Sequence, residues 1–178
     1  GKVYISDIPK DISYIEVTSG YRFNCHIDPG FKHASKIASW NRSHVKVFII
    51  DGIIESVSEI HHLLEALSES KEPGVIFTRG YAEDVITTLA TNYKRNTLDI
   101  IPVIVPYDLE GMNMLKDIAV ACGCDVTSSL KGELISNIKF DEVMAGSGSL
   151  DGGLEGGLVT VPNGATAELN SNMAAFRL

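Results

Sequence analysis

Asp51 is a candidate catalytic or metal-binding residue of this 178-residue chain. It follows Val47-Phe-Ile-Ile50, an apolar run typical of a buried strand, and ligands of α/β proteins often bind at the carboxyl ends of strands. The following Gly52-Ile53-Ile54 supplies no second carboxylate. The simpler interpretation is a turn residue at a strand end. The alternative is a small α/β hydrolase that uses Asp51.

Two pairs of reactive side chains are adjacent in sequence. Cys25 and His26 would form a nucleophile and a base only if they converged, but neighbours in an extended segment point to opposite faces. His61 and His62 lie in a helical pattern, where adjacent side chains do not face each other and form no chelate. Metal binding would require the fold to gather several of the five histidines, which are His26, His33, His44, His61 and His62.

The three cysteines form no even disulfide framework. Cys122-Gly-Cys124 lacks the second pair of ligands that a zinc site requires, so we interpret these two and Cys25 as reduced thiols of an intracellular protein. Gly146-Ser-Gly148 lacks the third glycine and the preceding strand of a dinucleotide fingerprint, which favours a linker over a phosphate-binding loop.

An alternation of strands and helices would position these side chains. Apolar runs predict strands at 47–51, 75–78, 100–105 and 125–127. Helical periodicity predicts helices at 56–70, 83–94 and 112–122, the first of them with a capping box of Ser56 and Glu59. Pro102 cannot donate a ladder hydrogen bond and so predicts an edge strand or a bulge. The alternation predicts an α/β fold, with helices packed on a largely parallel sheet.

The flanking segments show other patterns. Asp28-Pro-Gly30 predicts a turn. The Gly-rich residues 145–157 are expected to form a flexible loop, and residues 158–169 are expected to return as a strand. We expect one domain over residues 1–178.

The first two predicted helices carry more apolar surface than one contact with a sheet requires. On a helical wheel the inward stripe of the first is Val57, Ile60, Leu64 and Leu67. His61 lies at the flank of that stripe, and His62 lies on the solvent side. The second helix has an inward stripe of Val85 and Leu89 and a second apolar face of Ile86, Ala90 and Tyr93. Uncovered faces on two neighbouring helices predict a shallow hydrophobic groove, and such a groove usually marks a binding site.

The charge of the chain excludes some classes of partner. Its 15 basic and 23 acidic residues give a formal net charge of -8, and the basic residues are scattered singly. Nucleic-acid binding needs a concentrated basic face, so we expect no nucleic-acid partner. The sequence shows no signal peptide and no apolar run long enough to span a membrane, and we expect a soluble cytoplasmic protein.

A pattern of residues distributed from Ile15 to Gly123 resembles a known family. Its parts are Ile15-Glu-Val17, Gly20, Phe23, Pro29, Phe31, Leu64-Glu-Ala66, Pro73, Leu89, Asn92, Arg95, Val105-Pro106, Leu115-Lys-Asp-Ile-Ala119 and Gly123. In order and spacing, residues 14–137 resemble the apical domain of the group I chaperonin large subunit, the GroEL family. The tail at 158–169 is similar to the strand that follows in that family.

The resemblance implies a domain that binds non-native polypeptides, and the mobile loop of a lid co-chaperonin, in a groove between two helices and an extended segment. Carried over by position, the binding residues are His26, Ile27, Gly30 and Phe31 in the extended segment, His61 and Leu64 on the first helix, and Ile86, Ala90, Thr91 and Asn92 on the second. The parent chain would form a ring of sister subunits. Its ATP and magnesium would bind in a separate equatorial domain, so we expect no catalytic residue, cofactor or metal in this segment.

Four positions depart from the family pattern. His61, Gly30 and Thr91 stand where the family has large apolar or aromatic residues, and Ala90 replaces a bulkier aliphatic residue. At about 25 cal/mol per Å² of buried apolar area, these losses would weaken binding by roughly a few kcal/mol. We therefore expect a divergent, specialised or viral member, acting in a bacterial cytoplasm or in that of an infected host.

Two alternatives stay open at this stage. One is the small hydrolase that uses Asp51. The other is an adaptor that keeps the fold but uses the groove for a single peptide.

Overall fold

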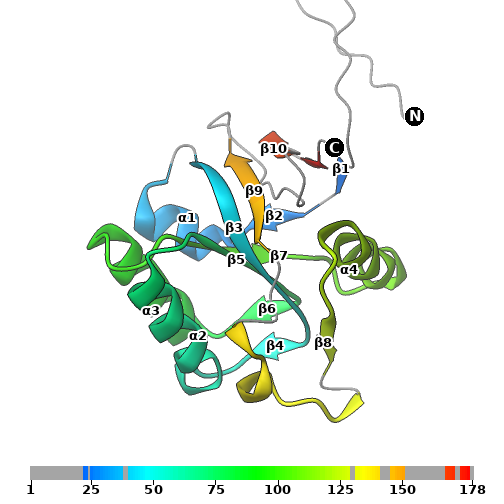
Figure 1. Ribbon diagram of the computed structural model, residues 1–178, viewed down its shortest axis with the longest axis horizontal. Coiled ribbons are helices and arrows are strands. Elements are labelled where there is room, and N and C mark those ends of the chain that lie inside the picture. Colours follow the sequence, from blue (N-terminus) through cyan, green and yellow to red (C-terminus); the bar gives the residue numbers. More distant parts are fainter. Residues whose placement is uncertain are drawn as a thin grey trace, which may run out of the picture.

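The computed structural model describes residues 22–23, 25–37, 40–128, 131–140, 145–150, 167–170 and 173–176. These residues form a mixed α/β fold in which helices lie on both sides of a mixed sheet (Figure 1). The predicted fold class is therefore confirmed at the level of an α/β protein.

Four parallel strands make up the centre of the sheet. They are β3 (Trp40–Asp51), β5 (Gly74–Thr78), β7 (Ile100–Ile104) and β8 (Val126–Ser128). β3 pairs with β5 on one edge and with β8 on the other, and β5 pairs with β7. Each strand lies close to its predicted position, but β3 begins well before the predicted residue 47. A small second sheet is formed by β4 (Ile53–Ile54) and β6 (Gly80–Tyr81).

The connecting helices are α2 (Val57–Ser70), α3 (Glu83–Lys94) and α4 (Leu109–Cys122). Figure 1 shows α2 and α3 on one side of the strands and α4 on the other. The capping box of Ser56 and Glu59 is confirmed, as is the extent of α3. α4 begins earlier than predicted, because the Asp108 carboxylate accepts a hydrogen bond of 2.7 Å from the Gly111 N–H and so caps the helix.

The Gly-rich segment was predicted to be a loop, and this is wrong for residues 145–150. They form β9 (Ala145–Leu150), which pairs antiparallel with the first part of β3. The physical reason is that β8 pairs only with residues 49–51 of β3, which leaves the rest of that edge in need of a partner. Residues 151–157 lie outside the described part of the chain.

Short strands complete both ends of the sheet. β10 (Ala167–Asn170) pairs with β9, β11 (Met173–Phe176) pairs with β10, and β1 (Arg22–Phe23) pairs with β11. Of the strand predicted at 158–169, only its last residues lie within the described ranges, where they belong to β10. At the opposite end, β2 (His26–Ile27) pairs antiparallel with β7.

Pro102 is not in an edge strand, so that prediction is wrong. β7 lies between β5 and β2. The Val105 N–H donates to the Thr78 carbonyl of β5, and strand periodicity therefore turns the Pro102 nitrogen toward β2. β2 ends there, where the Asp28 N–H donates to the Pro102 carbonyl over 3.0 Å. The missing N–H thus falls at the last rung of the ladder.

Asp28-Pro-Gly30 does not form the predicted turn but begins a helix, α1 (Pro29–Ser35). The Asp28 carboxylate accepts a hydrogen bond of 2.9 Å from the Phe31 N–H. Proline is favourable in the first turn, because it lacks only an N–H that the helix would leave unpaired. The helix ends at Lys36, which has a positive φ of 56°.

We expect Gly111→Ala to destabilise the protein by roughly 3 kcal/mol. A Cβ atom on Gly111 would overlap the Pro106 carbonyl oxygen and lie 2.7 Å from Nη1 of Arg79, so the start of α4 would have to move. This strain outweighs the better helix propensity of alanine. Urea unfolding measures the effect. Gly80→Ala is the control, because its Cβ would meet Ile53 at an ordinary 3.8 Å, and equal midpoints for the two variants would contradict the prediction.

Candidate functional site

α1 lies along α3 and covers its second apolar face (Figure 1). Phe31 is fully buried, and its ring meets that of Tyr93 edge-on at a centroid distance of 5.5 Å. A Cβ atom placed on Gly30 would lie only 3.3 Å from Cγ2 of Ile86. The backbone of α1 therefore lies directly on the face of α3 that was predicted to be open.

The shallow hydrophobic groove predicted between α2 and α3 is not open in the structure, so that prediction is wrong. Its apolar residues are buried: Ile27, Phe31, Leu64, Ile86 and Ala90. Ile86 is 7% exposed and Ala90 is 2% exposed. Sequence periodicity identified an extra apolar face on α3 correctly, but it could not show that α1 supplies the cover.

The polar residues assigned to the groove lie at the surface. His26, Gly30, His61 and Thr91 are exposed, and Asn92 is half-buried. Nδ1 of His61 lies 3.6 Å from a carboxylate oxygen of Glu65, one turn further along α2. The Thr91 hydroxyl and the Asn92 amide both donate to carbonyls of their own helix. The structure thus brings the predicted site residues of α1 and α3 into contact. His61 instead contacts Glu65 of its own helix.

Within the described residues, large apolar side chains are exposed at other places. They are Ile53, Tyr107, Leu109, Met112, Val120 and Leu134. Leu109, Met112 and Val120 fall within an arc of roughly 80° on the outer side of α4. Sequence reasoning missed this surface because it began α4 at Met112 and did not consider which faces of this helix are apolar. The signal available was a helix with apolar residues on two opposite sides.

Asp51 pairs with a buried arginine. Nε of Arg79 donates to an Asp51 carboxylate oxygen over 2.7 Å, and the Arg79 side chain is only 1% exposed. Nη1 of Arg79 donates to the Pro106 carbonyl, and the guanidinium lies 5.6 Å from the centroid of the Tyr107 ring. Asp51 therefore neutralises a buried charge, and this role does not favour the hydrolase alternative.

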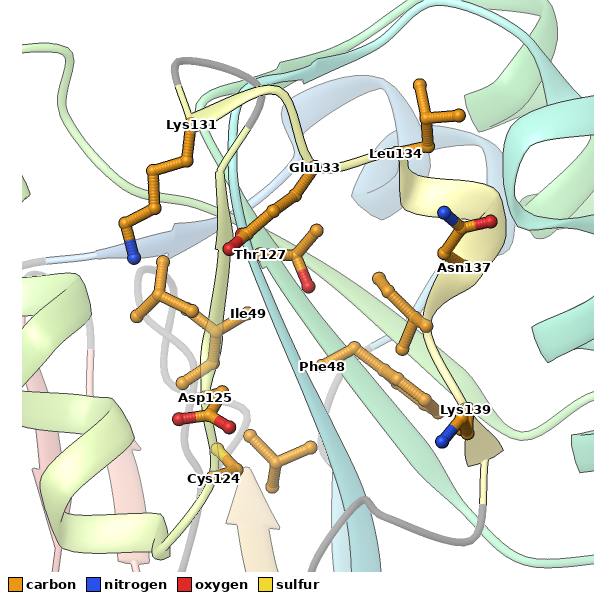
Figure 2. Close-up of a pocket in the computed structure, with 13 residues that line it drawn as sticks. Phe48, Ile49, Cys124, Asp125, Thr127, Lys131, Glu133, Leu134, Asn137 and Lys139 are labelled. Atoms are coloured by element: carbon orange, nitrogen blue, oxygen red, sulfur yellow. The ribbon is translucent and has the colours of Figure 1, made fainter.

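A pocket of about 500 Å³ opens beside β8, a place that sequence analysis did not single out (Figure 2). β3 and β8 form one wall, and the segment around the short helix η2 (Ile135–Asn137) forms the other. Phe48, Ile49 and Ile138 supply apolar surface. The charged residues that line it are Asp125, Lys131, Glu133 and Lys139.

Hydrogen bonds hold the walls of this pocket. A Glu133 carboxylate oxygen accepts from the Ser128 N–H over 2.8 Å. Nε2 of His62 lies 3.0 Å from the Ile138 carbonyl and ties α2 to the η2 segment. His62 was predicted to face solvent, but it is half-buried in this contact. The sequence around His62 could not predict this contact, because its partner Ile138 is 76 residues further along the chain.

Neither a metal centre nor a membrane span is found in the described residues. No three side chains of His, Cys, Asp or Glu come together there in a way that could hold a metal ion. No helix in the same ranges has the length and apolar character needed to cross a bilayer.

Comparison with known proteins links the chain to chaperonins. It is 28% identical over 130 residues to the chaperonin GroEL of Mycoplasmoides gallisepticum, which covers 72% of this chain and 23% of that protein. It is 29% identical over 99 residues to the chaperonin GroEL of Mycoplasma genitalium, which covers 52% of this chain and 18% of that protein. No protein-family model matches the chain. These similarities support a chaperonin-related protein, and the chain spans less than a quarter of the length of these relatives.

We expect Asp51→Ala to destabilise the protein by roughly 3 kcal/mol, because it leaves the buried Arg79 guanidinium without its counter-charge. Urea unfolding followed by circular dichroism gives the change in free energy. Glu65→Ala is the matched control. It removes a carboxylate whose partner is largely exposed, and it should cost less than about 0.5 kcal/mol. Equal stability of the two variants would show that Asp51 is not a structural residue.

Proposed function

We propose that this chain is the apical domain of a divergent chaperonin, and that it binds non-native polypeptides to assist their folding. The observation that carries the proposal is the similarity to two GroEL proteins, which reaches 72% of this chain but only 23% of the first relative. Such coverage is what one domain of a larger subunit would give. The apolar faces of α1, α2 and α3 supply side chains of the kind that an unfolded polypeptide buries.

The proposed binding site is the face formed by α3 with its neighbours. The residues carried over from the family at this face are His26, Ile27, His61, Leu64, Ile86, Ala90, Thr91 and Asn92. The other two, Gly30 and Phe31, belong to α1 and would contact the client from the displaced helix. Because Ile86 and Ala90 lie under the protein's own chain, a client must exchange places with α1 before it reaches them.

α1 is suited to such an exchange. It has only seven residues, far fewer than the roughly 12 to 15 that an isolated helix needs to be stable in water. Phe31 is its one fully covered side chain, and Asp28 is its N-terminal cap. When α1 moves away, the uncovered face of α3 can accept apolar side chains of a client in its place. The apparent affinity is then lower than the intrinsic affinity, since it is reduced by the small fraction of molecules in which α1 is displaced.

The wider function follows from the same proposal. The parent subunit would form a cytoplasmic ring with sister subunits, and ATP with magnesium would bind in a separate domain of that subunit. The mobile loop of a lid co-chaperonin would compete with clients for the α3 face. The domain alone would bind clients reversibly and weakly, without hydrolysing ATP.

A direct test measures binding of the 178-residue chain to several unrelated proteins that are kept unfolded by carboxymethylation, such as α-lactalbumin. A chaperone should bind most of them with similar affinity. Binding to one alone would instead support an adaptor, and binding to none would overturn the proposal. Stabilisation of the chain by magnesium with a nucleotide, measured by thermal shift, would favour the enzyme alternative.

We expect Asp28→Ala to strengthen client binding by about fivefold. Removal of an N-cap destabilises a helix by about 1 kcal/mol, which raises the fraction of displaced α1 by that factor. Fluorescence anisotropy with a labelled unfolded client measures the change.

Asp108→Ala is the matched control, because it removes the equivalent cap from α4 and should leave client affinity unchanged. Val120→Ser tests the exposed apolar side of α4 as a rival surface. If Val120→Ser weakens binding while Asp28→Ala has no effect, clients bind at α4 and the assignment to α3 is wrong.

A further inference from the structure

Cys122 and Cys124 lie at the junction between α4 and the pocket beside β8. Cys122 is the last residue of α4 and is buried, whereas Cys124 is half-buried and lines the pocket. Figure 2 shows Cys124 beside Asp125, with Lys131 and Glu133 further along the same wall. Cys124 therefore lies at the surface of the pocket, and Cys122 does not line it.

The end of α4 folds the chain so that the two cysteines approach each other. Gly123 between them has a left-handed conformation with φ 65° and ψ 31°, and the Cys124 N–H donates to the Ala119 carbonyl over 3.0 Å. A residue with helical torsions brings its two neighbours to a Cα separation of roughly 5.4 Å, whichever the hand of the helix. This separation is within the range of disulfides, about 4.4 to 6.8 Å.

We propose that Cys122 and Cys124 form a thiol–disulfide exchange site, in which Cys124 attacks disulfides that enter the pocket and Cys122 resolves the mixed disulfide.

The environments of the two sulfurs fit these separate roles. The neighbouring Cys122 side chain lowers the pKa of the Cys124 thiol, although burial and the Asp125 carboxylate act against it. The Cys124 side chain and burial raise the pKa of Cys122, which also lies at the negative end of the α4 dipole. The thiolate is the attacking form, so Cys124 reacts first. Burial raises the pKa of the remaining cysteine, Cys25, to about 12, which makes it unreactive in the folded protein.

The exchange balances without a further reactant. The Cys124 thiolate attacks one sulfur of a disulfide, the S–S bond breaks, and the first thiolate leaves and takes a proton from water. Cys122 then loses its proton to water and attacks the Cys124 sulfur, which expels the second thiolate. The substrate disulfide is reduced to two thiols, and the Cys122–Cys124 dithiol is oxidised to a disulfide.

The pocket suits a substrate that carries both kinds of charge. Its volume of about 500 Å³ accommodates a small peptide disulfide. Lys131 can pair with a carboxylate, while Asp125 and Glu133 can pair with an ammonium group. Such disulfides occur in small peptides and in unfolded polypeptides. Both sources present a disulfide with the charged groups of a peptide on either side.

A disulfide between residues two apart closes a very short loop. It restricts the unfolded chain little, and strain makes such a bond easier to reduce. The oxidised pair would therefore pass its disulfide on to other thiols, unlike a structural disulfide.

Oxidised glutathione is the first probe. The folded chain is incubated with it at pH 7.5, quenched with acid, alkylated and mapped by mass spectrometry. The expected product is a Cys122–Cys124 disulfide with Cys25 still alkylated. Cys122→Ser should accumulate a stable glutathione adduct at Cys124, and Cys124→Ser should react at least about tenfold more slowly than the parent chain. Cys25→Ser is the control and should react like the parent chain.

Several results would overturn the site. They are an unchanged rate in Cys124→Ser, no adduct in Cys122→Ser, or a disulfide that includes Cys25. Cys122→Ala is a second variant for the case in which a buried serine unfolds the protein, and circular dichroism of each variant verifies the fold.

Two further reagents test recognition by the pocket. Lys131→Ala should slow the reaction with oxidised glutathione by about fivefold, through loss of a partly exposed ion pair, and should not change the rate with neutral bis(2-hydroxyethyl) disulfide. An equal change with both reagents would exclude charge recognition by Lys131. The reaction rate with a peptide disulfide from an unfolded protein is then compared with the rate for oxidised glutathione. A higher rate with the peptide would indicate a polypeptide substrate, and a higher rate with oxidised glutathione would indicate a small one.

Discussion

The burial of β3 on both faces and both edges is the constraint on which the rest of the molecule depends. Val45 and residues 47–50 are almost fully buried, so helices must cover the sheet on both sides. β5 occupies one edge of the strand, while β9 and β8 share the other. The pocket uses residues 47–49 as a wall, and Asp51 at the end of the strand holds Arg79. The pocket and the Asp51–Arg79 pair thus depend on this one strand for their positions.

Local signals in the sequence predicted the central part of this fold. Periodicity defined α3 to the residue, and the capping box fixed the start of α2, because both depend on neighbours within one or two turns. The wrong predictions concern segments whose local sequence fits more than one structure, or whose structure depends on residues far away in the chain. Asp28-Pro-Gly30 fits a turn and a helix start equally well. The Gly-rich composition of β9 gave no side-chain pattern, and its pairing depends on an edge of β3 about a hundred residues earlier.

The candidate sites differ in how much of them the sequence could reveal. The apolar face of α3 was visible as periodicity, but its burial depends on α1, which was not recognised as a helix. The Asp51 partner, Arg79, is 28 residues away and could not be inferred from spacing. The pocket depends on the η2 segment, which was not predicted at all. Cys122 and Cys124 were noted as a pair, but their relation to a pocket required the position of β8.

The position of α1 gives another explanation for two of the departures from the family pattern, Gly30 and Ala90. From the sequence, Gly30 and Ala90 indicated a groove that had lost apolar surface. In the structure, a Cβ on Gly30 would already press against both Asp28 and Ile86, at 3.1 and 3.3 Å. Ala90 lies between Ile86 and Tyr93 on the face of α3 that α1 covers, where a bulkier side chain would need the same space. Small residues at these two positions therefore allow α1 to pack closely on α3. Their effect is to let α1 cover the remaining apolar surface of α3.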